Sequence, residues 1–141
     1  MDEITIHRCV PGDEGLLDQI AEEVFDDPID HAKLTHYLSQ PGHHLFVAIE
    51  KGVVVGQLTA LSYQHPENRP GDFYIDEVGV SPSTRRRGIA TRLMAAALTL
   101  GKQLGCAEAW LGTEINNREA QAFYESLGRK ADPVLYYTFK L

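Results

Sequence analysis

Several stretches of the chain alternate apolar and polar residues or carry short apolar runs rich in β-branched residues, which is the pattern of β-strands. The predicted strands are residues 3–10 (EITIHRCV), 44–50 (HLFVAIE), 53–64 (VVVGQLTALSYQ), 72–80 (DFYIDEVGV), 107–114 (AEAWLGTE) and 134–141 (VLYYTFKL). Lys51 and Gly52 join the second and third of them, which predicts a β-hairpin. The segment 65–71 (HPENRPG) is expected to be a loop, because it is rich in Pro, Asn and Gly.

Four other segments repeat apolar residues every three or four positions, which predicts amphipathic helices. They are residues 11–25, with Leu17, Ile20, Ala21 and Val24 inward; 26–40, with Leu34, Tyr37 and Leu38 inward; 88–104, with Ile89, Leu93, Ala97, Leu100 and Leu104 in one stripe; and 116–128, with Ala120, Phe123, Tyr124 and Leu127 in one stripe. Asp13 is the expected N-cap of the first helix, and Asn116 with Glu119 resembles a capping box for the last. Gly105 and Gly128 end the two later helices.

The order of these elements is β-α-α-β-β-β-α-β-α-β, without repeats, linkers or low-complexity segments. It predicts the α/β (α+β) class, with a mixed sheet and helices on its faces. A length of 141 residues predicts a single domain over residues 1–141.

The net charge of the chain, -7, argues against nucleic acid or an anionic membrane as a partner and suits a cationic one. Without a membrane-length apolar run or a signal peptide, the protein is expected to be cytoplasmic. Cys9 and Cys106 are far apart and lie in no metal-binding pattern, so free thiols and no metal site are expected.

One short segment, RRRGIATRLM at residues 85–94, is unusual in so acidic a chain. It follows a predicted strand and opens a predicted helix, whose first turn leaves backbone N–H groups without partners and carries a partial positive charge. Gly88 and Ala90 let a ligand approach that backbone, and the arginines add charge-assisted hydrogen bonds. The segment therefore predicts a phosphate site. The alternative, a solvated basic helix start, places the charge at the unfavourable end of the helix dipole.

The motif Arg85-x-x-Gly88-x-Ala90 resembles the Q/R-x-x-G-x-G/A signature of the GNAT superfamily of acyl-CoA-dependent N-acetyltransferases. Two further segments resemble the family in the same order: FYIDEVGVSPS at 73–83, and the helix Asn117-x-x-Ala120-x-x-Phe123-Tyr124-x-x-x-Gly128. The resemblance covers residues 72–128 and is strongest to the branch that contains aminoglycoside acetyltransferases acting on the 3-amino group. Arg129 departs from the pattern, where a Phe is usual.

The resemblance implies the GNAT fold: a central mixed, mostly antiparallel sheet, splayed at its middle, with helices on both faces. It also implies acetyl-CoA as co-substrate. The residues that would hold its phosphates are Arg85, Arg86, Arg87, Gly88, Ile89, Ala90 and Thr91. Val78, Gly79 and Val80 would meet the pantetheine arm as an added strand does, and Asn117 would bond the arm or a water.

Three residues are candidates for acid–base chemistry. Tyr124 matches the general acid of the family, although its place on an apolar stripe also fits a core aromatic. Asp76 and Glu77 are the candidate bases; in a regular strand they face opposite sides, Asp76 with Val78 and Val80, unless a bulge intervenes. The acidic residues of segment 22–30, and Glu114, would border the acceptor site.

Together these features predict transfer of an acetyl group from acetyl-CoA to a primary amine, on a small cationic acceptor such as an aminoglycoside or a polyamine. Two alternatives stay open: a protein or peptide N-acetyltransferase, and a non-catalytic acyl-CoA-binding module. Dimers are frequent in the family, which makes a homodimer an expectation here, with residues 134–141 as a partner edge.

Overall fold

The structure, a computed structural model, describes residues 3–141. It divides into two compact units, one up to Leu111 and one from Gly112 to Leu141. Each unit is described by itself below.

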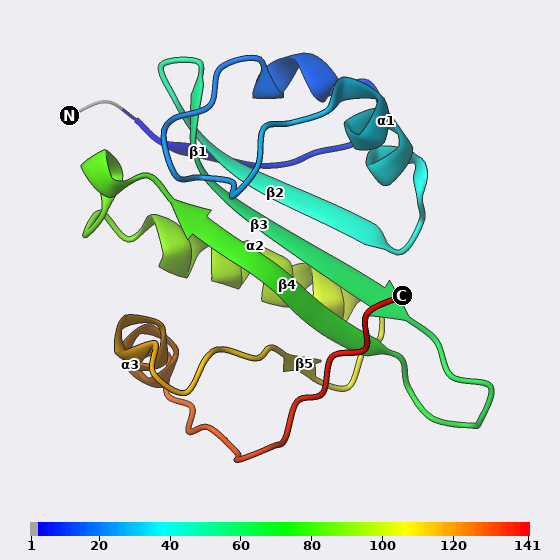
Figure 1. Cartoon of the computed structure of the whole chain (residues 1–141). Coiled ribbons are helices and arrows are strands. Elements are labelled where there is room, and N and C mark those ends of the chain that lie inside the picture. The colour runs from blue at the N-terminus through cyan, green and yellow to red at the C-terminus, as the bar shows by residue number, and fades with distance from the viewer. Residues whose placement is uncertain (1–2) are drawn as a thin grey trace. The chain divides into compact units, whose positions relative to one another are not determined.

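The first unit is built on a five-stranded sheet with the order β1-β2-β3-β4-β5 (Figure 1). Its strands are β1 (Thr5–Arg8), β2 (His43–Glu50), β3 (Val53–Tyr63), β4 (Asp72–Val80) and β5 (Ala109–Trp110). The first four are antiparallel neighbours, and β5 runs parallel to β4. Lys51 and Gly52 form the predicted hairpin turn with φ angles of 51° and 76°, which confirms that a two-residue turn joins β2 and β3.

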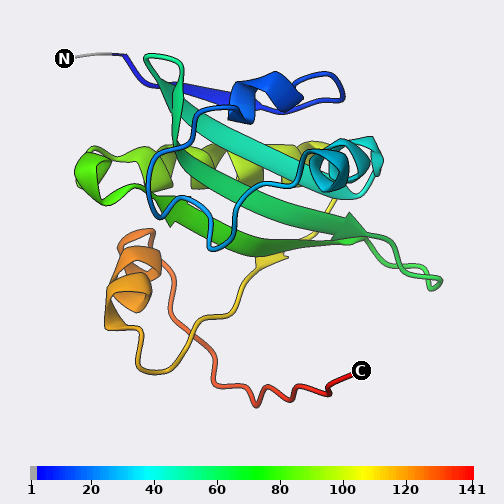
Figure 2. The ribbon, with the colours of Figure 1, turned by 45° about the horizontal axis from the view of Figure 1, so that its top comes forward.

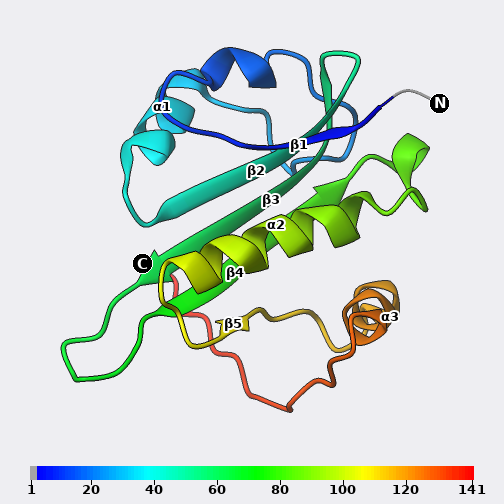
Figure 3. The same cartoon turned by 180° about the vertical axis from the view of Figure 1, so that it is seen from behind.

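Helices cover both faces of this sheet, as the fold class predicts. The helix α2 (Ile89–Gln103) lies along one face, which Figure 3 shows from behind. The short 3-10 helix η1 (Glu14–Leu17) and the helix α1 (His31–Ser39) lie on the other (Figure 1). On α2 the apolar stripe is buried as predicted, except that Leu104 at its end is 43% exposed. We call these the α2 face and the α1 face.

The helix predicted over 11–25 is wrong: only η1 forms, and the chain from there to α1 lies over the sheet without regular structure (Figure 2). Backbone hydrogen bonds explain why. The start of β3 at Val54 lies beyond the end of its pairing with β4. The Val54 N–H donates to the Gln19 carbonyl at 2.9 Å, and the Val54 carbonyl accepts from the Ala21 N–H at 2.8 Å. Tertiary pairing of the backbone therefore replaces helical pairing. Val24 is still buried, at 2% exposure.

The splay of the sheet appears between β4 and β5. These strands pair only through Phe73 with Ala109 and Tyr74 with Trp110. The strand predicted over 107–114 is therefore much shorter than expected. From Ile75 onward, β4 has no strand partner on that side within the described part of the chain.

The second unit contains the helix α3 (Arg118–Ser126), close to its predicted place. Its N-cap is Asn117, whose side chain accepts a hydrogen bond from the Ala120 N–H at 3.1 Å; the capping box at Asn116 is therefore wrong by one residue. Residues 134–141 form no strand, contrary to their pattern. A strand needs a hydrogen-bonding neighbour, and an alternating pattern does not supply one. Among residues 3–141, no helix is long and apolar enough to span a membrane.

Candidate functional site

The arginine-rich turn ends in a helix start without a side-chain cap. Gly88 is the N-cap of α2 in the left-handed conformation, at φ 74°, and none of the described side chains caps the helix there. The first helical bond runs from the Arg92 N–H to the Gly88 carbonyl at 3.0 Å. The N–H groups of the first turn, from Ile89 to Thr91, are thus left for another acceptor, as an anion site requires.

Two residues of this turn hold it on the first unit. The Arg87 guanidinium forms a forked ion pair with Glu50 at the end of β2, at 3.1 and 2.6 Å. This hydrogen bond, with some opposition from burial, holds the pKa of Glu50 below its usual range. The Ile89 side chain is 2% exposed and packs against β3 at Gly56. The Arg87 side chain therefore anchors the turn to β2, and its contact with phosphate stays a prediction.

The free edge of β4 carries Val78, Gly79 and Val80. Because pairing with β5 ends at Tyr74, this edge is open to an added strand in the described part of the chain. Gly79 has a further reason to lack a side chain. A Cβ there would collide with the carbonyl oxygen of Val24, so Gly79 lets the loop between η1 and α1 cross closely over the sheet.

A β-bulge places both candidate carboxylates on the α1 face. Thr59 pairs with Glu77 and Ala60 with Ile75, so Asp76 is an extra residue in β4. Ile75 points toward the α2 face, and the bulge turns Asp76 and Glu77 both to the α1 face. The bulge that the sequence left open is present, so the regular-strand arrangement, in which Asp76 would share a face with Val78 and Val80, does not apply.

Glu77 lies among carboxylates and one amide. Burial, with the charges of Asp26 and Asp76, raises its pKa, while a hydrogen bond from Gln57 at 3.2 Å works against this and Asp27 adds to the rise. Asp26 and Asp27 come from the loop between η1 and α1. A carboxylate with a raised pKa is a better proton acceptor near neutral pH, which suits a general base.

Tyr37 is a neighbour of this site that the sequence assigned to packing alone. Its hydroxyl donates to the His44 carbonyl at 2.8 Å, and its ring lies 4.8 Å from that of His43. Burial raises its pKa, and the charges of Asp76 and Glu77 add to the rise, so both carboxylates act on this hydroxyl. The only signal for Tyr37 in the sequence was its residue type: an aromatic ring with a polar hydroxyl, on a predicted helix that ends just before a predicted strand.

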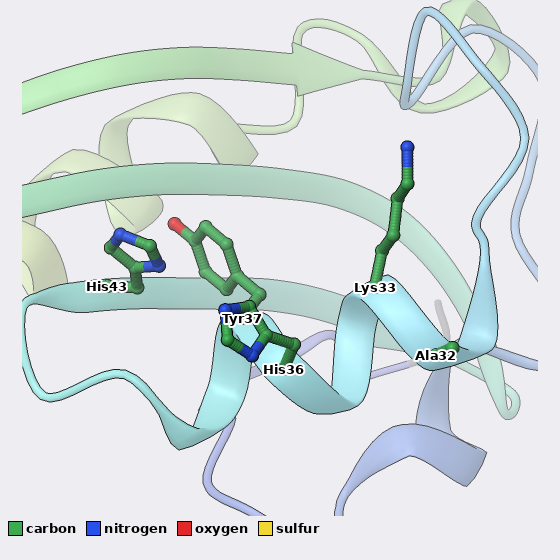
Figure 4. Close-up of a pocket in the computed structure, with 5 residues that line it drawn as sticks. All are labelled: Ala32, Lys33, His36, Tyr37 and His43. Carbon is green, nitrogen blue, oxygen red and sulfur yellow. The ribbon is translucent and has the colours of Figure 1, made fainter.

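Two hollows open on the α1 face. One, of about 430 Å³, is lined by Ala32, Lys33, His36, Tyr37 and His43; Figure 4 shows the Tyr37 and His43 rings side by side. The other, of about 290 Å³, is lined by Ile20, Ala21, Phe25, Asp26, Asp27, Pro28 and Ile29. The loop acids thus divide: Asp26 and Asp27 line a hollow and act on Glu77, whereas Asp30 caps α1 by accepting from the Lys33 N–H at 2.9 Å.

The remaining candidates, Asn117 and Tyr124, lie in the second unit. Asn117 caps α3, so its side-chain oxygen is occupied by a helix N–H. Tyr124 is half-buried, with its ring 5.1 Å from that of Phe123, and burial raises its pKa. A raised pKa keeps the phenol protonated, as a proton donor must be.

No group of three or more metal-ligating side chains occurs among residues 3–141. Cys9 and Cys106 are both free thiols. Burial, with the charge of Asp13, raises the pKa of the Cys9 thiol to about 12, so it is not a nucleophile at neutral pH.

Comparison with known proteins gives one family match. The acetyltransferase (GNAT) family matches residues 14–128. The chain is 31% identical to an aminoglycoside N(6')-acetyltransferase type 1 of Serratia marcescens, over 78% of this chain and 80% of that protein. It is 28% identical to N-alpha-acetyltransferase 30 of Schizosaccharomyces pombe, over 78% of this chain and 73% of that one.

The fold is also similar to those of solved aminoglycoside acetyltransferases. An aminoglycoside acetyltransferase from an uncultured soil metagenomic sample, in complex with sisomicin, has a TM-score of 0.83 at 21% identity, and the alignment covers 98% of this chain and 96% of that one. Aminoglycoside N-acetyltransferase AAC(6')-Iy in complex with CoA has a TM-score of 0.76 at 25% identity, covering 100% and 97%. These aminoglycoside relatives are named for the 6′-amino group where a position is given, whereas the sequence resemblance pointed to enzymes that act on the 3-amino group.

Proposed function

Because the chain belongs to the acetyltransferase (GNAT) family and is an N-acetyltransferase, we propose that it transfers the acetyl group of acetyl-CoA directly to a primary amine of a small cationic acceptor, such as an aminoglycoside or a polyamine. The observation that carries the acceptor class is the bulge in β4, which turns Asp76 and Glu77 to the same face as Asp26 and Asp27. Its relatives with aminoglycoside-modifying names support the same class.

The cofactor part of the proposal uses two backbone features. The N–H groups of the first turn of α2, behind Gly88, hold the pyrophosphate, with the arginine-rich turn from Arg85 adding positive charge. The free edge of β4 at Val78–Val80 pairs with the pantetheine arm. An N–H of that edge holds the negative charge that develops on the thioester oxygen.

The chemical step needs a base and an acid. A primary ammonium has a pKa of about 10.4, so it arrives protonated and must lose a proton before its nitrogen attacks the thioester carbon. Glu77 accepts that proton, and its raised pKa narrows the gap to the amine. As the carbon–sulfur bond breaks, the Tyr124 hydroxyl gives its proton to the thiolate, and the surplus proton on the attacking nitrogen passes to the tyrosinate as the amide forms. Asn117, whose amide oxygen caps α3, serves the arm through its remaining N–H groups.

A second acceptor class has support from the relatives. The chain also resembles N-alpha-acetyltransferases, among them one of Arabidopsis thaliana at 33% identity over 67% of this chain and 48% of that protein, so an N-terminal peptide amine is the alternative substrate. A non-catalytic acyl-CoA-binding module would need the turn at Gly88 but no paired carboxylates. We also propose that a single family domain spans both units and that the protein is a cytoplasmic homodimer. The proposed reaction uses no metal ion, and nucleic acid is not a proposed partner.

A thiol-release assay tests the function. Purified protein and acetyl-CoA are mixed with aminoglycosides that carry or lack the 6′- and 3-amino groups, with spermidine, and with peptides bearing a free N-terminus. Release with a polyamine or an aminoglycoside supports the proposal, and product mass gives the acetylated position. Release with peptides alone favours the alternative, and no release with any amine refutes acetyl transfer to these classes.

The turn has its own test, Gly88→Glu, which places a negative side chain where phosphate is expected. Calorimetry should then detect no acetyl-CoA binding. The backbone there is left-handed, at φ 74°, so any side chain adds strain of about 1 kcal/mol. Gly88→Asn is the matched control, because Asn tolerates this conformation and adds no charge. Equal affinity in wild type and folded Gly88→Glu would refute the phosphate site.

A further inference from the structure

Gln57 is a polar residue at the centre of β3 with no exposed surface. Its side-chain Nε2 donates to the Glu77 carboxylate and to the Val24 carbonyl, both at 3.2 Å. These acceptors use both hydrogens of the amide, which also fixes the orientation of its oxygen and nitrogen. The Oε1 atom is buried without a partner among the described residues. A buried, half-satisfied amide costs free energy, so packing alone does not account for it.

The loop is shaped to bring the Val24 carbonyl to Gln57. Glu23, just before it, has a φ of 60°, a left-handed conformation that is strained in a residue with a side chain. Val24 itself is 2% exposed in the core. Gly79 stands opposite Gln57 in the strand register and leaves the room that the carbonyl occupies. The strained Glu23, the buried Val24 and the absence of a side chain at Gly79 thus all favour the hydrogen bond from Gln57 to the Val24 carbonyl.

We propose that Gln57 is a positioning residue that ties the acidic loop to Glu77, so that the loop receiving the cationic acceptor and the carboxylate taking its proton form one unit. This rests on the proposed function for the identity of the proton donor. The tie itself rests on the contacts of Gln57 alone.

The tie has a consequence for the proton. With Glu77 Oε1 held by the amide, Oε2 is the oxygen that receives the proton: the N–H bond of the ammonium breaks and an O–H bond forms at Oε2, while Oε1 still accepts from Gln57. Asp26 and Asp27 from the loop, Asp76 from β4 and Tyr37 from α1 also face this carboxyl. The negative charges of the three aspartates favour the protonated form of Glu77, and the Gln57 hydrogen bond opposes them.

Carboxyl titration by nuclear magnetic resonance tests the tie without catalysis. The side-chain carbon of Glu77 is followed against pH in wild type, Gln57→Leu and Thr59→Val. Gln57→Leu removes the hydrogen bond to the charged form, so its midpoint should rise above that of wild type. Thr59 lies opposite Glu77, on the same strand and face as Gln57, and Thr59→Val should leave the Glu77 midpoint unchanged. An unchanged midpoint in Gln57→Leu overturns the proposal, and Gln57→Met replaces it if the leucine variant does not fold.

Kinetics test whether the tie serves the reaction. Gln57→Leu should lower kcat for the amine by about ten- to a hundredfold, the rate equivalent of one hydrogen bond to a charged group, with KM for acetyl-CoA unchanged. The acid limb of the pH profile of kcat/KM should move to higher pH. In a Glu77→Gln background the same substitution should change kcat little, because Gln57 acts through Glu77.

Equal losses in both backgrounds would show a structural role and overturn the positioning role. Wild-type protein that releases no thiol with any amine would refute the proposed function alone. The titration would then still decide whether Gln57 sets the state of Glu77.

Discussion

The two faces of β3 and β4 are built from neighbouring residues and differ in almost every property. On the α2 face, Leu58 and Ala60 are fully buried, and α2 packs so closely that a Cβ at Gly56 would lie 2.9 Å from Ile89. On the α1 face, Gln57 and Thr59 stand one residue away along β3. The first face is apolar and closed, whereas the second carries hydrogen bonds, carboxylates and two hollows.

Unsatisfied polar atoms sharpen this contrast. Among residues 3–141, three buried side-chain atoms have no partner, and all belong to residues of the α1 face: His43 Nδ1, Gln57 Oε1 and Thr59 Oγ1. Such atoms lower stability, since their hydration is lost without replacement. The α1 face also buries an apolar cluster that includes Leu34, Leu38, Leu45 and Val47, so both faces of the sheet provide folding free energy. The difference is that the α1 face, in the described part of the chain, also holds buried polar atoms without partners.

The largest expected effect comes from Glu77→Gln on the α1 face. It removes the proposed base and keeps the shape, so kcat for the amine should fall by about 10²–10⁴-fold, with KM for the amine raised and KM for acetyl-CoA nearly unchanged. Steady-state thiol release measures all three. Asp76→Asn, one residue away on the same face, is the matched variant and should lose less. A larger loss in Asp76→Asn would exchange the roles of the two carboxylates.

Leu93→Ala on the α2 face should do the opposite. Leu93 is fully buried, so its truncation should lower the free energy of unfolding by about 2–5 kcal/mol, with both KM values of the folded fraction unchanged. Urea unfolding gives the first quantity. Leu98→Ala, on the same helix at 43% exposure, is the control and should cost much less. A selective rise in KM for acetyl-CoA in Leu93→Ala would contradict the division between the faces.

His44 is a buried polar residue on the α2 face, where its ring nitrogen is hydrogen-bonded to the Ser62 hydroxyl at 2.8 Å, and acid should reveal its contribution to stability. Burial, with the charges of Arg8 and His43, lowers its pKa from 6.5 to about 4, while its ring stacks on Phe73. Between these values the unfolded chain binds a proton that the folded chain does not, so stability should fall as pH falls through this window, by about 3 kcal/mol at most. Urea unfolding against pH measures it. His44→Gln should remove this slope, and an unchanged slope would exclude His44 as its cause.

The smallest effect is expected from Thr59→Val on the α1 face. Replacing an unpartnered buried hydroxyl by a methyl group should leave stability unchanged or raise it by up to about 1 kcal/mol. Thermal unfolding and thiol release are the measurements, and turnover should stay at the wild-type level. A clear loss of stability would mean that the hydroxyl is hydrogen-bonded, and would weaken the contrast between the faces.

Much of this architecture follows from local pattern. The hairpin turn at Lys51 and Gly52 and the buried stripe of α2 were predicted because each depends on residues close in sequence. The helix predicted over 11–25 failed although its apolar spacing was correct. The side chains of Leu17 and Val24 are buried as that spacing requires, but the backbone between them found hydrogen-bond partners on Val54.

The sequence by itself determined the elements that hold the candidate site: the turn before α2, with its glycine and arginines, and the strand that carries Asp76 and Glu77. Short-range rules suffice there, because a helix start exposes its N–H groups wherever it lies. Only the tertiary structure decided which way the carboxylates face. The bulge depends on the register of β4 against β3, and the pairing of Glu77 with Gln57 joins residues 20 positions apart. Contacts over such a separation arise from the packing of whole strands, and no local pattern encodes them.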